Sequence, residues 1–174
     1  MGTANATKHT VRHATIDDMP QLERIFEAGR QIMRANDNPT QWANGYPQRQ
    51  LLEEDIARKC LYIIEGADGL PHGAFYFAVE DDPTYHVIED GAWLNDEPYG
   101  VIHRIASDGL EHGIFRTALQ FALQHTSNVR IDTHADNKPM QNALAREGFQ
   151  SCGIIYCIDG TPRVAYQLAA PLQR

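Results

Sequence analysis

Long apolar runs are absent from this chain of 174 residues. No stretch reaches the roughly 20 apolar residues that a membrane-spanning helix needs, and the opening MGTANATKHT lacks the apolar core of a signal peptide. Cysteine is also scarce. Cys60, Cys152 and Cys157 cannot all pair within one chain, and none stands in CxxC spacing. We therefore expect a reduced, cytoplasmic protein without membrane association.

Clustered positive charge is missing as well. The formal net charge is −8, and lysine and arginine form no dense run, so we expect no nucleic-acid partner. The acidic balance suits a basic amine substrate, and it is equally typical of an ordinary soluble surface. With 43% hydrophobic residues, the chain is long enough to bury the core of one domain.

Several catalytic motifs are also absent. The chain contains no GxSxG, GxxxxGK[ST] or GxGxxG sequence, which argues against a hydrolase elbow, a P-loop and a dinucleotide site. Its eight histidines include no HExxH pair, and paired CxxC motifs are missing. We therefore expect no metal.

Alternating and helical apolar patterns predict a single domain over residues 10–170, after a frayed segment 1–9. We expect an α/β (α+β) fold, with a mixed central sheet of about six to seven strands and about four flanking helices. The predicted strands span 10–14, 60–65, 72–79, 99–107, 129–134, 152–158 and 163–168, with a short extended piece at 86–88. The predicted helices span 16–35 and 48–59, a segment beginning after Gly113, and a segment ending at Gly148.

The loop NDNPTQWANGYPQRQ carries two large rings, Trp42 and Tyr46. Aromatic residues on a loop line a binding cleft or cap the core, and the sequence leaves both options open.

A second feature is the stretch from Ile105 to Phe149, where a strand leads through a turn with Gly113 into a helix. The free N–H groups at such a helix start can bind a phosphorylated ligand.

Three segments in this order resemble the GNAT superfamily of N-acetyltransferases: the opening Val11–Asp18, the strand-turn-helix unit Tyr99–Leu123, and Asn137 followed by Gly148-Phe149. The chain departs from the family pattern in two segments. In the turn 110–115 only Gly113 matches the usual glycine-rich motif, and Leu144 stands where many relatives have a tyrosine that protonates the departing thiolate.

The resemblance implies that acetyl-coenzyme A lies between the strands 99–107 and 129–134, which splay apart at a bulge in the first. Residues expected to bind it are Ile105, Ala106, Ser107, His112, Gly113, Ile114, Phe115, Arg116, Thr117 and Asn137. Three of these positions have ordinary alternatives. Gly113 also suits a plain loop, Arg116 suits a solvent-facing position, and Asn137 suits an Asx turn that caps the next helix.

The implied reaction is direct attack of a small-molecule or peptide amine on the thioester. An alkyl amine has a pKa of about 10, so a base must take its proton. Our first candidate is His103, which could instead be a packed or supporting residue. The full set of catalytic candidates is His103, Glu89, His134 and Tyr156, the last as a replacement acid. Asp132 would orient a histidine, or pair with Arg104 or Arg130.

Trp42, Tyr46 and Trp93 are the expected walls of the acceptor pocket. The losses at Leu110, Phe115 and Leu144 leave an alternative: a non-catalytic sensor or scaffold that binds acyl-coenzyme A. A relative of the fold without any cofactor is a third reading. The resemblance also allows a homodimer through the C-terminal strands.

Overall fold

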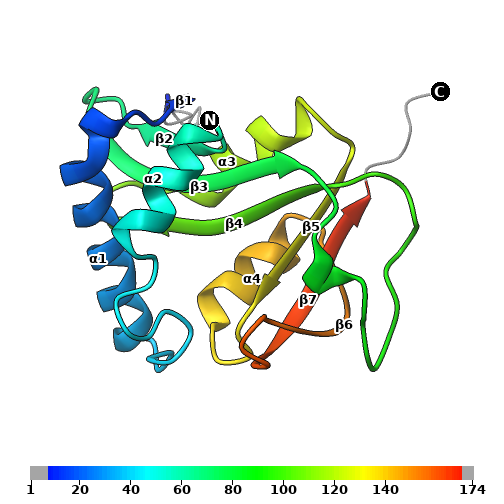
Figure 1. Cartoon of the computed structure of the whole chain (residues 1–174). Helices are drawn as coiled ribbons and strands as arrows, with labels where there is room; N and C mark the ends of the chain where they lie inside the picture. Colours follow the sequence, from blue (N-terminus) through cyan, green and yellow to red (C-terminus); the bar gives the residue numbers. More distant parts are fainter. Residues whose placement is uncertain (1–7, 170–174) are drawn as a thin grey trace, which may run out of the picture.

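The computed structural model describes residues 8–169, which form one twisted sheet with helices on both faces (Figure 1). Within this range the elements are β1 (Thr10–His13), η1 (Ile16–Asp18), α1 (Met19–Ala35), α2 (Arg49–Ala57), β2 (Leu61–Glu65), β3 (Pro71–Val79), η2 (Pro83–Tyr85), β4 (Gly100–Ser107), α3 (Ile114–Leu123), β5 (Asn128–Thr133), α4 (Lys138–Arg146), β6 (Gln150–Tyr156) and β7 (Pro162–Ala169).

The strands lie in the order β1-β2-β3-β4-β5-β7-β6. Every neighbouring pair is antiparallel except β4 and β5, which run parallel. A parallel pair needs a crossover connection, and α3 supplies it. The expected fold class, a mixed sheet with one parallel pair and four helices, is therefore confirmed.

The helix expected over residues 16–35 begins later than predicted. Residues 16–18 form the 3-10 turn η1, and α1 starts at Met19 with Pro20 in its first turn. Proline fits there because the first helical N–H groups need no partner within the helix. Asp18 and Thr15 form a capping box just before it, so the predicted N-cap position holds.

The extended piece expected at residues 86–88 is not a strand. Asp82 accepts a hydrogen bond from the backbone N–H of Thr84 and starts the 3-10 turn η2. After this turn only Glu89 pairs, in an isolated bridge with Ile154 of β6. The Asp-Pro pair therefore turns the chain where alternation alone predicted an extended segment.

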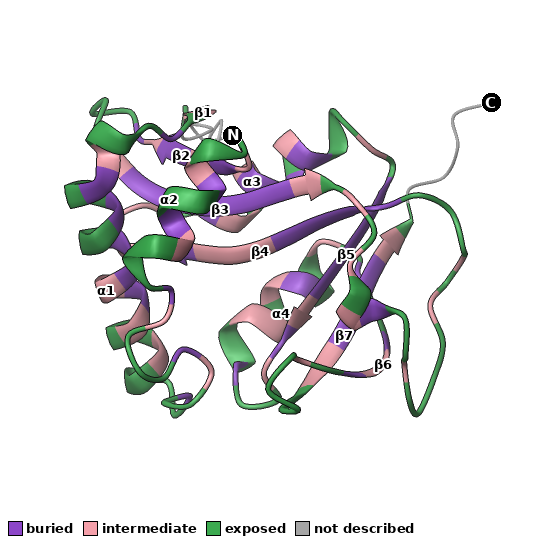
Figure 2. Cartoon of the chain, viewed as in Figure 1, coloured by how far each residue is buried: buried purple, intermediate pink, exposed green. Residues whose placement is uncertain are grey.

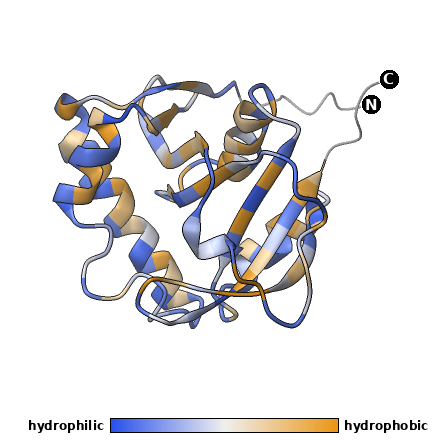
Figure 3. Ribbon diagram, turned by 45° about the vertical axis from the view of Figure 1, so that its right-hand side comes forward, coloured by the Kyte–Doolittle hydropathy of each residue, from blue (hydrophilic) through white to orange (hydrophobic). Residues whose placement is uncertain are grey.

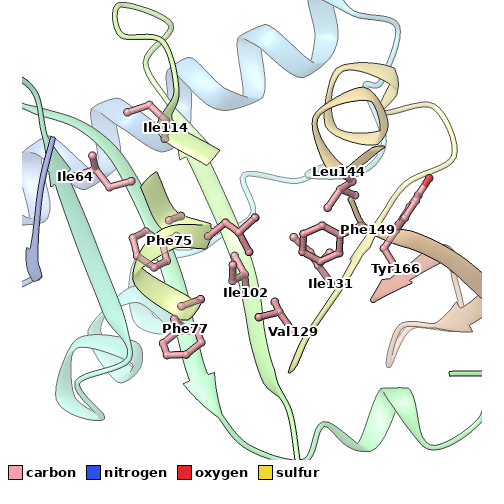
Figure 4. Close-up of a cluster of buried hydrophobic side chains, with 13 residues drawn as sticks. Ile64, Phe75, Phe77, Ile102, Ile114, Val129, Ile131, Leu144, Phe149 and Tyr166 are labelled. Atoms are coloured by element: carbon pink, nitrogen blue, oxygen red, sulfur yellow. The ribbon is translucent and has the colours of Figure 1, made fainter. Parts of the chain in front are cut away.

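Apolar residues fill the space on both faces of the sheet, and the buried positions in Figure 2 follow the strands and the inward sides of the helices. Hydrophobic and hydrophilic residues alternate along the strands (Figure 3). Under α3 and α4 the core includes Ile102, Ile131, Leu144 and Phe149 (Figure 4). Under α1 and α2 a second cluster includes Leu22, Phe26, Trp42 and Leu61.

The amino-terminal segment expected to fray lies outside the described residues up to position 7. Within the described part, the ring of His9 is within hydrogen-bond distance of Thr117 Oγ1 at 2.6 Å and Glu111 Oε2 at 3.2 Å. The side chain of His9 is only 3% exposed, so it packs against the start of α3. None of the helices between residues 8 and 169 has the length and apolar character to span a membrane.

Candidate active site

The sheet opens where its two parallel strands meet. β4 and β5 pair only at Gly100–Val129 and Val101–Arg130. Beyond these positions β4 runs on without β5 beside it. Backbone groups on that edge of β4 are then left for another partner.

A bulge lies in the same part of β4. On β3 the register shifts between Ala74 and Tyr76, so that Arg104 and Ile105 fall between the paired residues His103 and Ala106. Arg104 has φ of +49°, a left-handed conformation that is uncommon for a residue with a side chain. The bulge and the splay are those that the resemblance implies.

A cleft of about 820 Å³ adjoins this opening. Its walls come from the loop 40–48 between α1 and α2, from β4 at 102–105, from the end of β5 and from the hairpin between β6 and β7. This volume lies within the range of about 300–1,000 Å³ that small-molecule sites occupy. The cleft is therefore large enough for an acceptor beside an extended ligand.

His103 faces this cleft between two carboxylates. Its Nε2 lies 2.8 Å from Asp82 Oδ2, and its Nδ1 lies 3.8 Å from Asp132 Oδ1. Burial alone would raise the pKa of Asp82, but the hydrogen bonds from His103 and Thr84 outweigh it and lower this pKa to about 2. Asp82 is therefore ionised at neutral pH and fixes the histidine ring.

The oxygen of Asp132 nearest to His103, Oδ1, also accepts a hydrogen bond from the Tyr85 hydroxyl at 2.6 Å. Burial, together with the neighbouring Asp132 carboxylate, raises the pKa of Tyr85 well above its usual value. Tyr85 thus stays a donor. The sequence left His103 and Arg104 open as neighbours of Asp132. In the structure Asp132 lies beside His103, whereas Arg104 pairs with Asp55.

His134 also lines the cleft, at the end of β5. Its Nε2 lies 3.3 Å from Thr40 Oγ1, and its Nδ1 accepts from the backbone N–H of Asp136 at 3.0 Å. The proton therefore sits on Nε2, since Nδ1 is the acceptor. His134 connects β5 to the 40–48 loop.

Glu89 and Tyr156, the other two catalytic candidates, lie together but outside the cleft. The Tyr156 hydroxyl donates to Glu89 Oε2 at 2.9 Å, and both residues are exposed. The bridge between Glu89 and Ile154 holds them at the outer edge of β6. The structure does not bring them to His103, so neither is in place to act on a ligand in this cleft.

Of the three aromatic residues expected to wall the acceptor pocket, two line the cleft and one does not. Trp42 and Tyr46 line the cleft, and Trp42 also packs on Phe26 in the core, so it does both things that the sequence left open. Trp93 does not line the cleft. Its N–H donates to the carbonyl of Tyr85, and its ring stacks on Arg130.

The expected phosphate turn lies at the start of α3. Gly113 is the N-cap residue of α3 and has a φ of +78°. Of the atoms in residues 8–169, a Cβ added there would meet only His9 Cε1, at 3.9 Å. Between residues 8 and 169 no side chain caps this helix, which leaves its first N–H groups available to a ligand. His112 is exposed beside this opening, and the Thr117 hydroxyl is engaged by His9.

The flanking cofactor candidates have contacts of their own. Ile114 is buried in the core, and the ring of Phe115 packs on Phe149 at 6.2 Å. Arg116 is exposed and donates to Glu147 at 2.8 Å. This solvent-facing ion pair is the ordinary alternative that the sequence left open for Arg116.

Ile105 lines the cleft, whereas Ala106 lies against α1, 3.3 Å from the position of a Cβ built on Gly29. The Ser107 hydroxyl accepts from the N–H of Gly109. Asn137 caps α4 by accepting from the N–H of Met140 at 3.2 Å, as the Asx alternative implies. It also lines the cleft, so a cap and a ligand contact remain compatible there.

Sequence reasoning missed Asp82, Tyr85 and Arg104. Asp82 lies in an acidic connection after β3, and its charge does not stand out beside those of Glu80 and Asp81. Tyr85 lies 47 residues before Asp132 in the sequence, and only the fold brings the two together. No signal in the sequence pairs Arg104 with Asp55, because 49 residues separate them.

One cluster of potential metal ligands lies outside the cleft. Ligand atoms of Asp68, His72 and Glu111 lie within 4.8 Å of one another. Both ring nitrogens of His72 already contact carboxylates, Asp108 at 2.7 Å and Asp68 at 2.8 Å. The cluster is thus satisfied as a network of ion pairs.

In this structure a parallel strand pair splays at a bulge and is followed by a helix start without a side-chain cap among the described residues. No protein-family model matches the chain, and no curated protein matches it in sequence. Solved structures do match. A GNAT-family acetyltransferase from Streptococcus agalactiae is 28% identical, with a TM-score of 0.82 over 92% of this chain and 95% of that one.

Two further structures agree in fold. A GNAT-family acetyltransferase from Listeria monocytogenes is 21% identical, with a TM-score of 0.68 over 95% of this chain and 96% of that one. An N-acetyltransferase from Staphylococcus aureus is 18% identical, with a TM-score of 0.59 over 93% and 98%. The chain has the fold of the GNAT superfamily of N-acetyltransferases. The likeness to the Streptococcus agalactiae acetyltransferase supports an acyltransferase function in general.

Proposed function

We propose that this protein is an N-acetyltransferase that transfers an acetyl group from acetyl-coenzyme A to a primary amine of a small molecule or peptide. The observation that carries the proposal is the opening of β4 from β5 at the bulge, with His103 in the adjoining cleft. The named acetyltransferases among the similar structures support the same chemistry.

The residues present fit coenzyme A. The open edge of β4 offers backbone groups to an amide-containing arm in the manner of an added strand. The space around Gly113 and the first N–H groups of α3 suit a pyrophosphate, which needs no particular side chain there. This explains why a turn that keeps only the glycine of the family motif still suits the cofactor.

Bound acetyl-coenzyme A would supply a thioester whose carbonyl carbon takes the acceptor nitrogen while the thiolate leaves. The chain's own part is to remove a proton from the amine. His103 suits this role, because Nε2–H donating to Asp82 leaves the lone pair of Nδ1 toward Asp132 and the cleft. Asp132 and Asp82 then stabilise the imidazolium that forms, and they favour a positively charged acceptor.

Two measurements test the proposal. The first follows thiol release when the protein is mixed with acetyl-coenzyme A and a panel of amines. The second compares the pH–rate profiles of the wild type and His103→Gln. We expect this variant to lose about 10²–10⁴-fold in rate and to show a pH–rate profile of a different shape. The control is His86→Gln, since His86 pairs with Asp81 on the surface. An unchanged profile in His103→Gln would refute the base assignment.

One observation favours a second candidate, a non-catalytic module that binds acyl-coenzyme A. Leu144, at the position of the usual tyrosine, is fully buried in the core, so it offers no acid to a leaving thiolate. This candidate predicts binding without turnover. A ligand at 100 times its dissociation constant raises stability by about 2.7 kcal/mol. A thermal shift with acetyl-coenzyme A but no thiol release from any amine would favour this module over the enzyme.

A further inference from the structure

Arg104 joins the two halves of the candidate site, although nothing in the sequence marks it. It stands in the β4 bulge with φ of +49°. Glycine adopts this conformation with less strain, so the bulge alone does not explain an arginine. The explanation lies in the contacts of its side chain.

The guanidinium of Arg104 contacts residues of α2, of the loop 40–48 and of β3. Its Nε and Nη2 contact Asp55 Oδ2 of α2 at 2.9 and 2.8 Å, and its Nη1 donates to the Tyr46 hydroxyl at 3.3 Å. The guanidinium carbon also lies 4.6 Å from the centre of the Tyr76 ring on β3. Asp55 is 1% exposed, so its charge depends on this partner.

Tyr46 belongs to the loop 40–48 that walls the cleft. Its carbonyl accepts from Arg30 Nη1 of α1 at 3.1 Å, so its backbone is fixed to the helix and its hydroxyl to the bulge. The same bulge separates β4 from β5 and leaves the strand edge open to the cofactor. One side chain therefore touches both the wall of the acceptor pocket and the strand expected to carry the cofactor.

We propose that Arg104 is a positioning residue that holds the acceptor loop 40–48 against the β4 bulge, so that binding of coenzyme A along β4 orders the acceptor wall. This inference rests on the proposed function for its ligand. In physical terms, a shift of the strand on ligand binding moves the guanidinium and with it the Tyr46 hydroxyl. The loop then has a different stability with and without the ligand.

Two conservative variants remove the hydrogen bond between Arg104 and Tyr46. Tyr46→Phe deletes one hydroxyl. Arg104→Lys keeps a positive charge for Asp55 but loses the planar fork that serves Asp55 and Tyr46 together. The control is Arg12→Lys, because Arg12 forks onto Asp18 at 2.8 and 2.9 Å on the far β1 edge and lines no part of the cleft.

The measurement is hydrogen–deuterium exchange of the loop 40–48 with and without coenzyme A, beside the coenzyme A dissociation constant and the acceptor KM. In the wild type and Arg12→Lys we expect coenzyme A to slow exchange in the loop. In Tyr46→Phe and Arg104→Lys we expect this protection to disappear. The acceptor KM should rise about three- to tenfold, the size of one hydrogen bond, with a smaller change in cofactor affinity.

Protection of the loop that persists in both variants overturns the inference, and so does a loss of cofactor affinity as large as the rise in KM. If coenzyme A binds the wild type without changing the loop, the coupling alone fails. If coenzyme A does not bind the wild type, the proposed function itself fails. Because Tyr46→Phe leaves the buried pair of Arg104 and Asp55 in place, a folding defect in Arg104→Lys does not remove the test.

Discussion

Replacing Asp82 with asparagine should make stability less dependent on pH. The carboxyl pKa falls from 3.8 to about 2 in the folded protein, because the bonds from His103 and Thr84 outweigh the burial that would raise it. A depressed carboxyl pKa stabilises the fold above the unfolded-state value of 3.8, and this gain disappears as the pH falls through about 2. Asparagine has a similar shape but cannot carry the charge.

The size of the effect follows from the two pKa values. At about 1.4 kcal/mol per pKa unit, the charged Asp82 contributes about 2 kcal/mol to folding at pH 7 and about 1 kcal/mol at pH 3. Asp82→Asn should therefore unfold in urea with a free energy about 2 kcal/mol lower than the wild type at pH 7. This difference in unfolding free energy between the variant and the wild type should be about half as large at pH 3.

The matched control is Asp81→Asn. Asp81 pairs with His86 on the exposed surface, where such pairs contribute little, and the asparagine oxygen can still accept from the Tyr99 hydroxyl as Asp81 does. Urea denaturation followed by circular dichroism at pH values from 3 to 7 measures each difference. A gap between Asp82→Asn and the wild type that stays constant over this range would refute the linkage, and so would one that widens toward low pH.

Two further predictions concern single positions. Gly113→Ala should cost about 1–2 kcal/mol of stability, because its φ is +78°, and should weaken acetyl-coenzyme A binding. Gly69→Ala, at φ +75° on the open tip of the β2–β3 hairpin and away from the cleft, should cost the same stability with normal binding in calorimetry. Equal affinities would show that Gly113 serves the turn only. Leu144→Ala should cost about 2–5 kcal/mol in urea, while Leu110→Ala, at a 74% exposed site, should stay within about 0.5 kcal/mol. Similar losses would contradict the core position of Leu144.

Local patterns predicted the fold well, because the strands and helices carry their own periodicity. The buried stripe from Met19 to Gly29 matches the helical spacing, and the hairpin at Asp159-Gly160 joins β6 and β7 where its turn chemistry indicated. Errors fell where a local hydrogen bond outweighs alternation. Asp82 turned the chain before the expected extended piece at 86–88.

The candidate site was harder to predict, because its contacts join residues far apart in sequence. The strand pattern predicted the position of His103, and the resemblance implied that β4 and β5 splay apart. Its partner Asp82 lies 21 residues away, and Tyr85 lies 47 residues from Asp132. Such pairs depend on how the connection after β3 folds back over the sheet, and residue spacing carries no information about that path. The roles proposed for His103 and Gly113 remain predictions.

The brief meeting of β4 and β5 has a mechanical consequence. Two paired positions are the entire ladder between the four strands β1–β4 and the three strands β5–β7 (Figure 1). Elsewhere the two parts of the sheet are joined by the α3 crossover, by the contact of His103 with Asp132 and by apolar side chains such as Ile102 and Ile131 (Figure 4). Apolar packing is not directional. The sheet is therefore compliant along this seam, and amides of the two parts should exchange as separate units in the free protein. A ligand bonded to both strands would act as the missing length of strand and stiffen the whole sheet.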